Sequence, residues 1–226
     1  MRQTVRQQPA NGDATEQTYE YRTLGRGILL CEDGAFTNGS LQWGPFSDFG
    51  AELGLIWQDR RLRIAQVFEK GSDLKSITLI RERRAESTAP ERPPLKLSDL
   101  LGRWTGTATT LYADYRPDTV QPSTLLIEQR GTVQVRQTLE LPGIPPIGST
   151  GQIDGSRISF GSGVQVLLLP DGGSCTCPMR IEPRQPLFLE MGWLVAPNHR
   201  LRLMRRYDAS GSWVSLTLVN EQKVAI

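Results

Sequence analysis

The sequence predicts an all-β protein, and three observations support this prediction. Short apolar stretches are separated by turns rich in glycine and proline, of which the chain has 22 and 15. Within several stretches apolar and polar residues alternate, as they do along a half-buried strand. The chain also repeats itself, because Leu62–Glu82 recurs as Leu201–Glu221 without a gap. Two units of the same antiparallel design are therefore expected.

The repeat is specific at the level of single residues. Identical pairs 139 positions apart are Arg61/Arg200, Leu62/Leu201, Arg63/Arg202, Ser76/Ser215, Thr78/Thr217, Leu79/Leu218 and Glu82/Glu221. Further matches lie upstream at an offset of 138, among them Asp33-Gly34 with Asp171-Gly172 and Glu52 with Glu190. In each unit the repeated stretch is predicted to form the closing hairpin, with the turn of the first copy at Lys70–Asp73.

The first unit follows a polar tail. Residues 1–18 are expected to be disordered, and residues 19–84 to form a partial β-domain. Its expected strands are Tyr19–Leu24, Gly27–Cys31, Leu41–Trp43, Ala51–Trp57, Leu62–Glu69 and Leu74–Arg81. A proline-rich linker, residues 85–96, contains Pro90, Pro93 and Pro94, which lack a backbone donor for a sheet.

The second unit, residues 97–226, is expected to be a complete antiparallel barrel. Ser98 can cap a helical turn over Asp99–Leu101, and Gly102 can end it. The strands predicted after it are Trp104–Leu111, Ser123–Glu128, Thr132–Leu141, Gly148–Ile153, Arg157–Phe160, Val164–Leu169, Leu187–Val195, Arg200–Tyr207 and Trp213–Asn220.

The two units are unequal. At the repeat offset Met1 corresponds to Leu139, so the first unit lacks a counterpart of residues 97–138. An open sheet with an uncovered apolar face is unstable. We therefore expect the missing edge to be covered by the second unit, by another subunit, for instance in a homodimer that covers the incomplete sheet, or by residues further upstream.

Charge and cysteine content exclude several classes of function. The net charge is only +2, which argues against nucleic-acid binding. No segment approaches the ~20 apolar residues of a membrane span, and the N-terminus lacks the apolar core of a signal peptide. Three cysteines without such a signal indicate a reducing, cytoplasmic (or plastid stroma-like) compartment. Cys175 and Cys177 are expected to be ordinary buried cysteines, since a structural zinc needs about four ligands.

Gly102-Arg103-Trp104, placed after the helical turn, resembles the Gly-x-Trp signature of lipocalins and their calycin relatives. That resemblance implies a barrel whose closed end is plugged by Trp104. Lipocalins also have an arginine on the final strand, packed over this tryptophan. Here that strand offers Asn220, and Arg202 or Arg205 on the preceding strand are the candidates to replace it.

The motifs FGAELGLI, QDRRLR, APERPPL and GWLVAPNHRLRLMRRYD resemble an uncharacterised cyanobacterial and plastid family, a domain of unknown function built from two lipocalin-like barrels. The likeness covers nearly the whole chain after residue 18, although family members begin with a complete first barrel. The family implies no catalytic residues. Its fold resembles that of bilin lyases, which is an analogy of fold and not of activity.

The candidate ligand-binding residues are Trp104, Glu190, Trp193, Arg202, Arg205 and Tyr207. Arg205 inside the barrel could bind a carboxylate; alternatively it lies at the barrel's end, stacked on Trp104 or paired with Glu190. Trp193 is either a core residue or a pocket wall. His199 has no partner that would make a catalytic or metal-binding constellation. No catalytic residue, metal site or cofactor is therefore predicted.

These features favour a non-enzymatic binder of an apolar or amphipathic molecule, such as a lipid, a pigment or a tetrapyrrole. This hypothesis requires a cavity of a few hundred Å3 in the second unit. A bilin or chromophore lyase or isomerase, using Glu190, Tyr207 or Arg205, is one alternative. The other is a structural or interaction protein that recruits partners through exposed sheet edges.

Overall fold

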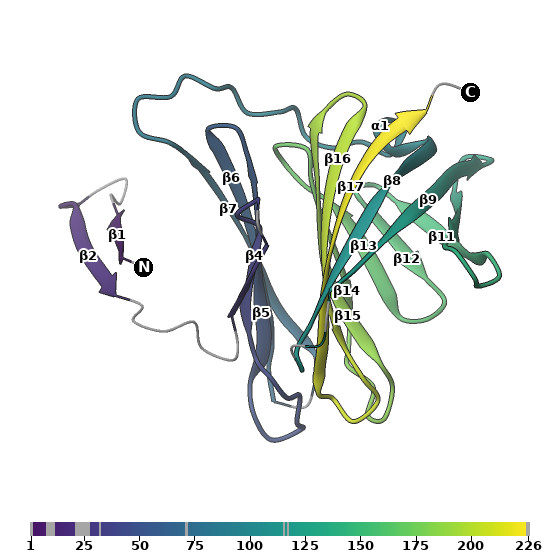
Figure 1. Cartoon of the computed structure of the whole chain (residues 1–226), viewed down its shortest axis with the longest axis horizontal. Coiled ribbons are helices and arrows are strands. Elements are labelled where there is room, and N and C mark those ends of the chain that lie inside the picture. Colours follow the sequence, from purple (N-terminus) through teal and green to yellow (C-terminus); the bar gives the residue numbers. More distant parts are fainter. Residues whose placement is uncertain are drawn as a thin grey trace.

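The computed structural model describes residues 2–7, 12–20, 28–31, 33–70, 72–114, 116 and 118–224. It confirms an all-β protein, with one short helix among the described residues. An open five-stranded sheet lies beside a closed ten-stranded barrel, and a separate two-stranded hairpin precedes them (Figure 1). All of the strand pairings are antiparallel.

The N-terminal hairpin differs from the expected disordered tail. It pairs β1 (Arg2–Gln7) with β2 (Thr15–Glu20). The sequence of β2, TEQTYE, includes two threonines and a tyrosine, residue types that favour strands, although the polar composition points to disorder. The strand predicted at Tyr19–Leu24 lies mostly outside the described residues.

The five-stranded sheet has the strand order β3-β4-β5-β6-β7, so each strand pairs with its neighbour in sequence. The strands are β3 (Ile28–Leu30), β4 (Phe36–Gly39), β5 (Phe49–Trp57), β6 (Arg60–Phe68) and β7 (Leu74–Arg83). The prediction of a strand at Leu41–Trp43 is wrong. Only Gln42 makes a bridge there, and its partner is Ser212 of the barrel.

A helical turn, α1 (Leu97–Leu100), leads into the barrel, which closes because the last strand pairs with the first. Its strands are β8 (Gly102–Tyr112), β9 (Thr119–Arg130), β10 (Gln134–Glu140), β11 (Ile147–Asp154), β12 (Arg157–Phe160), β13 (Val164–Leu168), β14 (Gly173–Pro178), β15 (Leu187–Ala196), β16 (His199–Tyr207) and β17 (Trp213–Val224). No strand was predicted at β14, whose six residues are all buried and therefore show no alternation.

One face of the open sheet packs on the outside of the barrel, where β5 contacts β15 and β16, and β6 contacts β14 and β15. The core between them contains Leu53, Leu62 and Ile64 of the sheet with Met191 and Leu203 of the barrel. Cys175 and Cys177 are also buried in this core. The second unit thus covers the apolar face of the first, whereas β3 and β7 remain the edges of the sheet among the described strands.

A buried ion pair joins the sheet, the linker and the barrel. Both Nη atoms of Arg60 donate to the carboxylate of Asp171, with Nη1 2.6 Å from Oδ1. The same oxygen accepts the backbone N–H of Arg92 in the linker, and Arg60 also donates to the Pro90 carbonyl. Asp171 lies in the Asp-Gly turn before β14, with a positive φ of 59°. This turn is therefore more than a chain reversal, because it fastens the two units together.

Candidate functional site

Strand β16 separates two environments, because its side chains alternate between the inside and the outside of the barrel. On the inner side, β16 contributes Arg202, Met204 and Arg206 to the lining of the cavity within the barrel. Their neighbours Leu201, Leu203, Arg205 and Tyr207 are buried on the outer side; both leucines and Tyr207 belong to the core shared with the open sheet. The division of this arginine-rich strand into two faces agrees with the period of two expected for a strand.

The barrel encloses a cavity of about 600 Å3. Its apolar lining consists of Ala108, Leu125, Leu139, Leu141, Ile147, Phe160, Val164, Phe188, Met204 and Val219. Its hydroxyl and amide lining consists of Thr110, Tyr112, Thr119, Gln121, Ser123, Gln137, Ser149, Ser162, Thr176, Ser215 and Thr217. Glu190, Arg202 and Arg206 add charge. The interior is thus hollow and amphipathic, with a size in the usual range of ligand pockets.

Strand pairing arranges the lining in layers across β15, β16, β17 and β8. Arg206 pairs with Phe188 and Ser215, Met204 with Glu190 and Thr217, and Arg202 with Gly192 and Val219. Arg206 and Ile147 are exposed to solvent, so their end of the cavity is its mouth.

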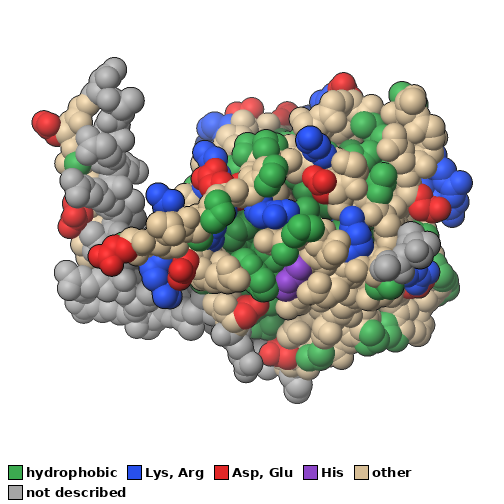
Figure 2. Space-filling view, turned by 90° about the horizontal axis from the view of Figure 1, so that it is seen from above, with side chains coloured by type: hydrophobic (Ala, Val, Ile, Leu, Met, Phe, Trp, Pro, Cys, Tyr) green, Lys and Arg blue, Asp and Glu red, His purple; other side chains and the backbone are tan. Residues whose placement is uncertain are grey.

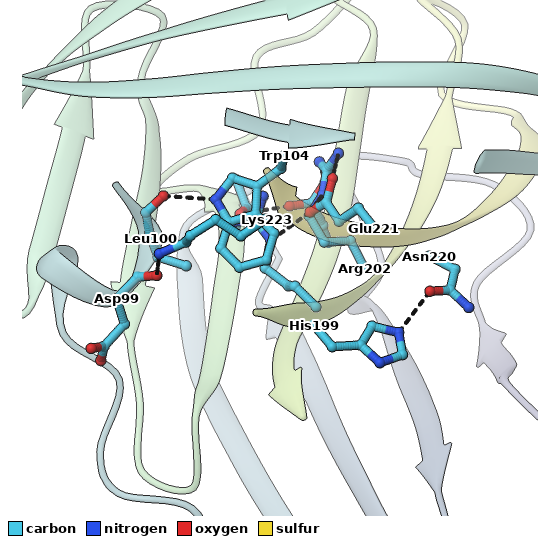
Figure 3. Close-up of polar contacts among 11 residues, drawn as sticks. Asp99, Leu100, Trp104, His199, Arg202, Asn220, Glu221 and Lys223 are labelled. Atoms are coloured by element: carbon cyan, nitrogen blue, oxygen red, sulfur yellow. Dashed lines mark hydrogen bonds and ion pairs between the residues drawn. The ribbon is translucent and has the colours of Figure 1, made fainter. Parts of the chain in front are cut away.

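The other end of the barrel is closed by Trp104, which is fully buried. Its indole Nε1 donates to the Leu100 carbonyl at 2.8 Å, so α1 holds the ring in place. Lys223 Nζ lies 4.9 Å from the centre of the ring and donates to the Asp99 carbonyl (Figure 3). The guanidinium of Arg200 stacks at 4.6 Å from the ring centre. The expectation that Arg202 or Arg205 covers this tryptophan is wrong, since Arg200 and Lys223 do so.

Between this plug and the cavity lies an ionic cluster. Arg202 donates from Nε to Glu221 at 3.0 Å and from Nη1 to Glu190 at 3.3 Å, and Arg200 donates from Nε to Glu221 at 2.5 Å (Figure 3). Burial raises the pKa of the Glu221 carboxyl, but the charges of Arg202 and Arg200 outweigh burial and hold the pKa below its ordinary value. Glu221 is therefore a buried carboxylate, and the cluster forms the charged floor of the cavity.

Arg205 lies outside the barrel, between the barrel wall and the open sheet. It donates to the Tyr207 hydroxyl at 2.7 Å and to the Ser40 carbonyl at 2.9 Å, and its guanidinium stacks 3.8 Å from the ring centre of Trp213. It neither points into the barrel nor touches Trp104 or Glu190, so all of its predicted positions are wrong. The period of two along β16 places Arg205 on the face opposite to Arg202, but the sequence does not tell which face is inside.

The structure therefore separates the six predicted ligand-binding residues. Glu190 and Arg202 line the cavity, and Trp104 plugs the barrel beyond it. Tyr207 and Arg205 lie on the outer side. Trp193 is also in the core between the units, and its Nε1 donates to the Asp171 carbonyl at 2.9 Å.

Several lining residues were missed by the sequence reasoning, including the inward-facing Ala108, Thr110 and Tyr112 of β8. Their spacing of two was visible, but threonine also fits a solvent-facing strand. Arg206 was not among the predicted ligand-binding residues, although it adjoins Arg205, which was. In contrast, His199 takes no part in the cavity. Its Nε2 lies 2.7 Å from Asn220 Oδ1 (Figure 3). Its ring packs edge-on at 4.5 Å from that of Trp57.

Two surface properties bear on other classes of site. On the described part of the face seen in Figure 2, acidic and basic side chains are interspersed, without a continuous basic tract. None of the helices in the described ranges has the length and hydropathy needed to cross a membrane.

Comparisons with known proteins agree with this two-part architecture. Residues 91–224 match the family described as "Biogenesis factor required for ATP synthase 1, C-terminal domain", and residues 1–87 match "Domain of unknown function (DUF3598), N-terminal". A crystal structure of a DUF3598 protein of unknown function from Nostoc punctiforme is 43% identical, with a TM-score of 0.89 over 98% of this chain and 84% of that chain.

A more distant similarity is to an S-type phycobiliprotein lyase from Guillardia theta. It is 12% identical, with a TM-score of 0.46 over 57% of this chain and 91% of that one. No curated protein matches the sequence.

Proposed function

The chain belongs to the DUF3598 family, in which it joins an N-terminal DUF3598 part to a C-terminal ATP synthase biogenesis factor domain, and we propose that its barrel binds a small amphipathic molecule. The observation that carries this proposal is the cavity of about 600 Å3 inside the barrel. Ligand pockets have volumes of about 300–1,000 Å3 and are lined mainly by apolar side chains with a few polar groups. Small closed barrels either have their interior filled by side chains or hold one small ligand.

The lining favours an amphipathic ligand over a purely apolar one. Apolar side chains such as Leu139, Phe160 and Phe188 offer dispersion contacts and burial, whereas Gln137 and Thr176 offer hydrogen bonds. The charged floor supports binding and not acid–base chemistry. Both acidic groups there, Glu190 and Glu221, are ion-paired with arginine, and Glu221 is held as a carboxylate.

The direct test is mass spectrometry of the protein, first under native conditions and then after solvent extraction of bound small molecules. Under native conditions we expect a mass above that of the polypeptide. Solvent extraction should then release one class of amphipathic compound that accounts for the difference. Ala108→Phe fills the inner part of the cavity, since Ala108 pairs with Val219 beside Arg202. The Ala108→Phe variant should therefore show only the mass of the polypeptide.

Val120→Phe is the matched control. Val120 lies on β9, between the cavity-lining residues Thr119 and Gln121, but is exposed and does not line the cavity. This variant should retain the ligand. Equal occupancy in both variants, with both folded by circular dichroism, would contradict binding in the barrel.

A second candidate function rests on the match of residues 91–224 to a domain named for ATP synthase biogenesis. In this alternative the protein assists assembly by binding an ATP synthase subunit. The open sheet supports it, because β3 and β7 are edge strands and an edge can pair with a partner strand. Retention of purified ATP synthase subunits on the immobilised protein tests it. Binding that survives Ala108→Phe would assign this role to a surface outside the cavity.

A further inference from the structure

We propose that the ligand carries a single anionic headgroup, such as a carboxylate, which Arg206 holds at the mouth of the cavity while the apolar tail extends inward. This inference rests on the proposed function and specifies the chemical class of the ligand. It depends on three observations: the position of Arg206, the state of the other charges around the cavity, and the distribution of polar groups at the mouth.

Arg206 lines the cavity at its mouth and is exposed to solvent. Within the described part of the chain, no carboxylate lies within ion-pair distance of its guanidinium. A guanidinium presents a planar set of donors that can bind a carboxylate through two parallel hydrogen bonds. Arg206 is therefore available to an anion in a way that its neighbours on β16 are not.

The other charges near the cavity compensate one another. Arg200 and Arg202 are bound to Glu221, and Arg202 also to Glu190, so two cations meet two anions at the floor. A further anion placed there would face both glutamates and would find the arginine donors already engaged. Arg206, which follows Arg200 and Arg202 on the same face of β16, has no carboxylate partner among the described residues. An anionic headgroup therefore fits the mouth and not the floor.

Polar neighbours at the mouth fit the same arrangement. Ser215 is the strand partner of Arg206, and Tyr112 is the next partner across, with its hydroxyl 3.1 Å from the Thr119 hydroxyl. Phe188 flanks Arg206 on the other side, in the same layer, and gives an apolar wall beside a headgroup. Arg206 lies four positions along β16 from Arg202, a distance of ~13 Å along the strand at ~3.3 Å per residue, and strand tilt makes the depth along the barrel axis smaller. A medium-length alkyl chain is a suitable probe for that depth.

The test compares dodecanoate with dodecanol by isothermal titration calorimetry of the full chain. We expect dodecanoate to bind about tenfold tighter than dodecanol, since a charge-assisted hydrogen bond contributes about that factor. Arg206→Gln should lower the affinity for dodecanoate about tenfold and leave dodecanol unchanged. Arg206→Lys should recover part of the loss, because it restores the charge but not the two-pronged geometry.

The control is Arg83→Gln, at an exposed position on β7 of the other unit, which should bind both probes as the unmodified protein does. Equal affinities for the two probes, unchanged by Arg206→Gln, would overturn the headgroup assignment while leaving a barrel ligand in place. A similar loss for both probes in Arg206→Gln would also overturn it, since Arg206 would then only shape the mouth. Failure of both probes to bind the unmodified protein would count against the proposed function itself.

Discussion

Arg63 and Arg202 occupy equivalent positions in the two units, and each bridges two glutamates. Arg63 contacts Glu52 at 2.5 Å and Glu82 at 2.9 Å, whereas Arg202 contacts Glu190 at 3.3 Å and Glu221 at 3.0 Å. The duplication therefore conserved a complete ionic cluster within this chain. In the second unit the cluster lies inside the closed barrel. In the first it lies on the face of the open sheet that points away from the barrel.

This difference in surroundings predicts a difference in stability. The Glu221 side chain is 0% exposed and that of Glu82 is 28% exposed. Glu221→Gln removes the partner of two buried arginines and should lower the free energy of unfolding by about 3 kcal/mol. Glu82→Gln, the matched substitution in the solvated cluster, should cost less than about 1 kcal/mol. Urea denaturation of both variants measures the two values. Equal losses would mean that burial does not distinguish the clusters.

The same glutamate predicts how stability depends on pH. The pKa of Glu221 in the folded protein lies below its ordinary value of 4.5, because Arg202 and Arg200 outweigh the effect of burial. A carboxyl with a depressed folded pKa binds protons more readily in the unfolded chain. Its stabilising contribution is therefore complete above about pH 4.5 and is lost as the pH falls through the folded pKa. Urea midpoints measured from pH 7 to pH 3 should fall less steeply in Glu221→Gln. An unchanged slope would contradict this origin of acid sensitivity.

The sequence predicts the strands well where one face is buried and the other is more exposed, as in the first copy of the repeated hairpin, β6 and β7. It fails at β14, because β14 lies between the cavity and the open sheet and is buried throughout. For the site, alternation assigns Arg202 and Arg205 to opposite faces. It cannot tell which face is the interior, because the outer wall of this barrel is covered by a second sheet and is as buried as the inside. Burial of the outer wall depends on the packing of the open sheet against it, which is a property of the tertiary structure. It therefore produces no periodic pattern of apolar residues in the sequence of the strand.

The ion pair between Arg60 and Asp171 should control how firmly the open sheet is held on the barrel. Their side chains are 8% and 0% exposed. Asp171→Asn keeps the size of the side chain and its tolerance of positive φ, but removes the buried charge partner of Arg60, which then has only the exposed Glu91, 4.0 Å away. We expect a loss of about 3 kcal/mol and faster proteolysis in the linker around Pro90. Arg81→Gln, which removes an exposed pair with Glu91, is the control and should cost less than about 1 kcal/mol.

If the linker around Pro90 is cleaved faster in both variants, or in neither, the ion pair between Arg60 and Asp171 does not fasten the two units.

Arg205 and Arg206 are adjacent in sequence but should have opposite mutational signatures. Arg205 is buried between the units, where it donates to the carbonyls of Gly39 and Ser40 and to Tyr207. Arg205→Met removes these hydrogen bonds, although the Tyr207 hydroxyl still donates to the Ser40 carbonyl, and it should lower the free energy of unfolding by about 2–4 kcal/mol. Because Arg205 lies outside the barrel, the affinity for dodecanol and dodecanoate should change less than twofold at temperatures where the variant is folded.

Arg206→Gln, at the exposed mouth, should instead change the free energy of unfolding by no more than about 0.5 kcal/mol. Thermal denaturation and calorimetry on the same preparations separate the two effects. A fully stable Arg205→Met variant with weakened binding would show that this side chain contributes to the ligand site, contrary to its position in the structure.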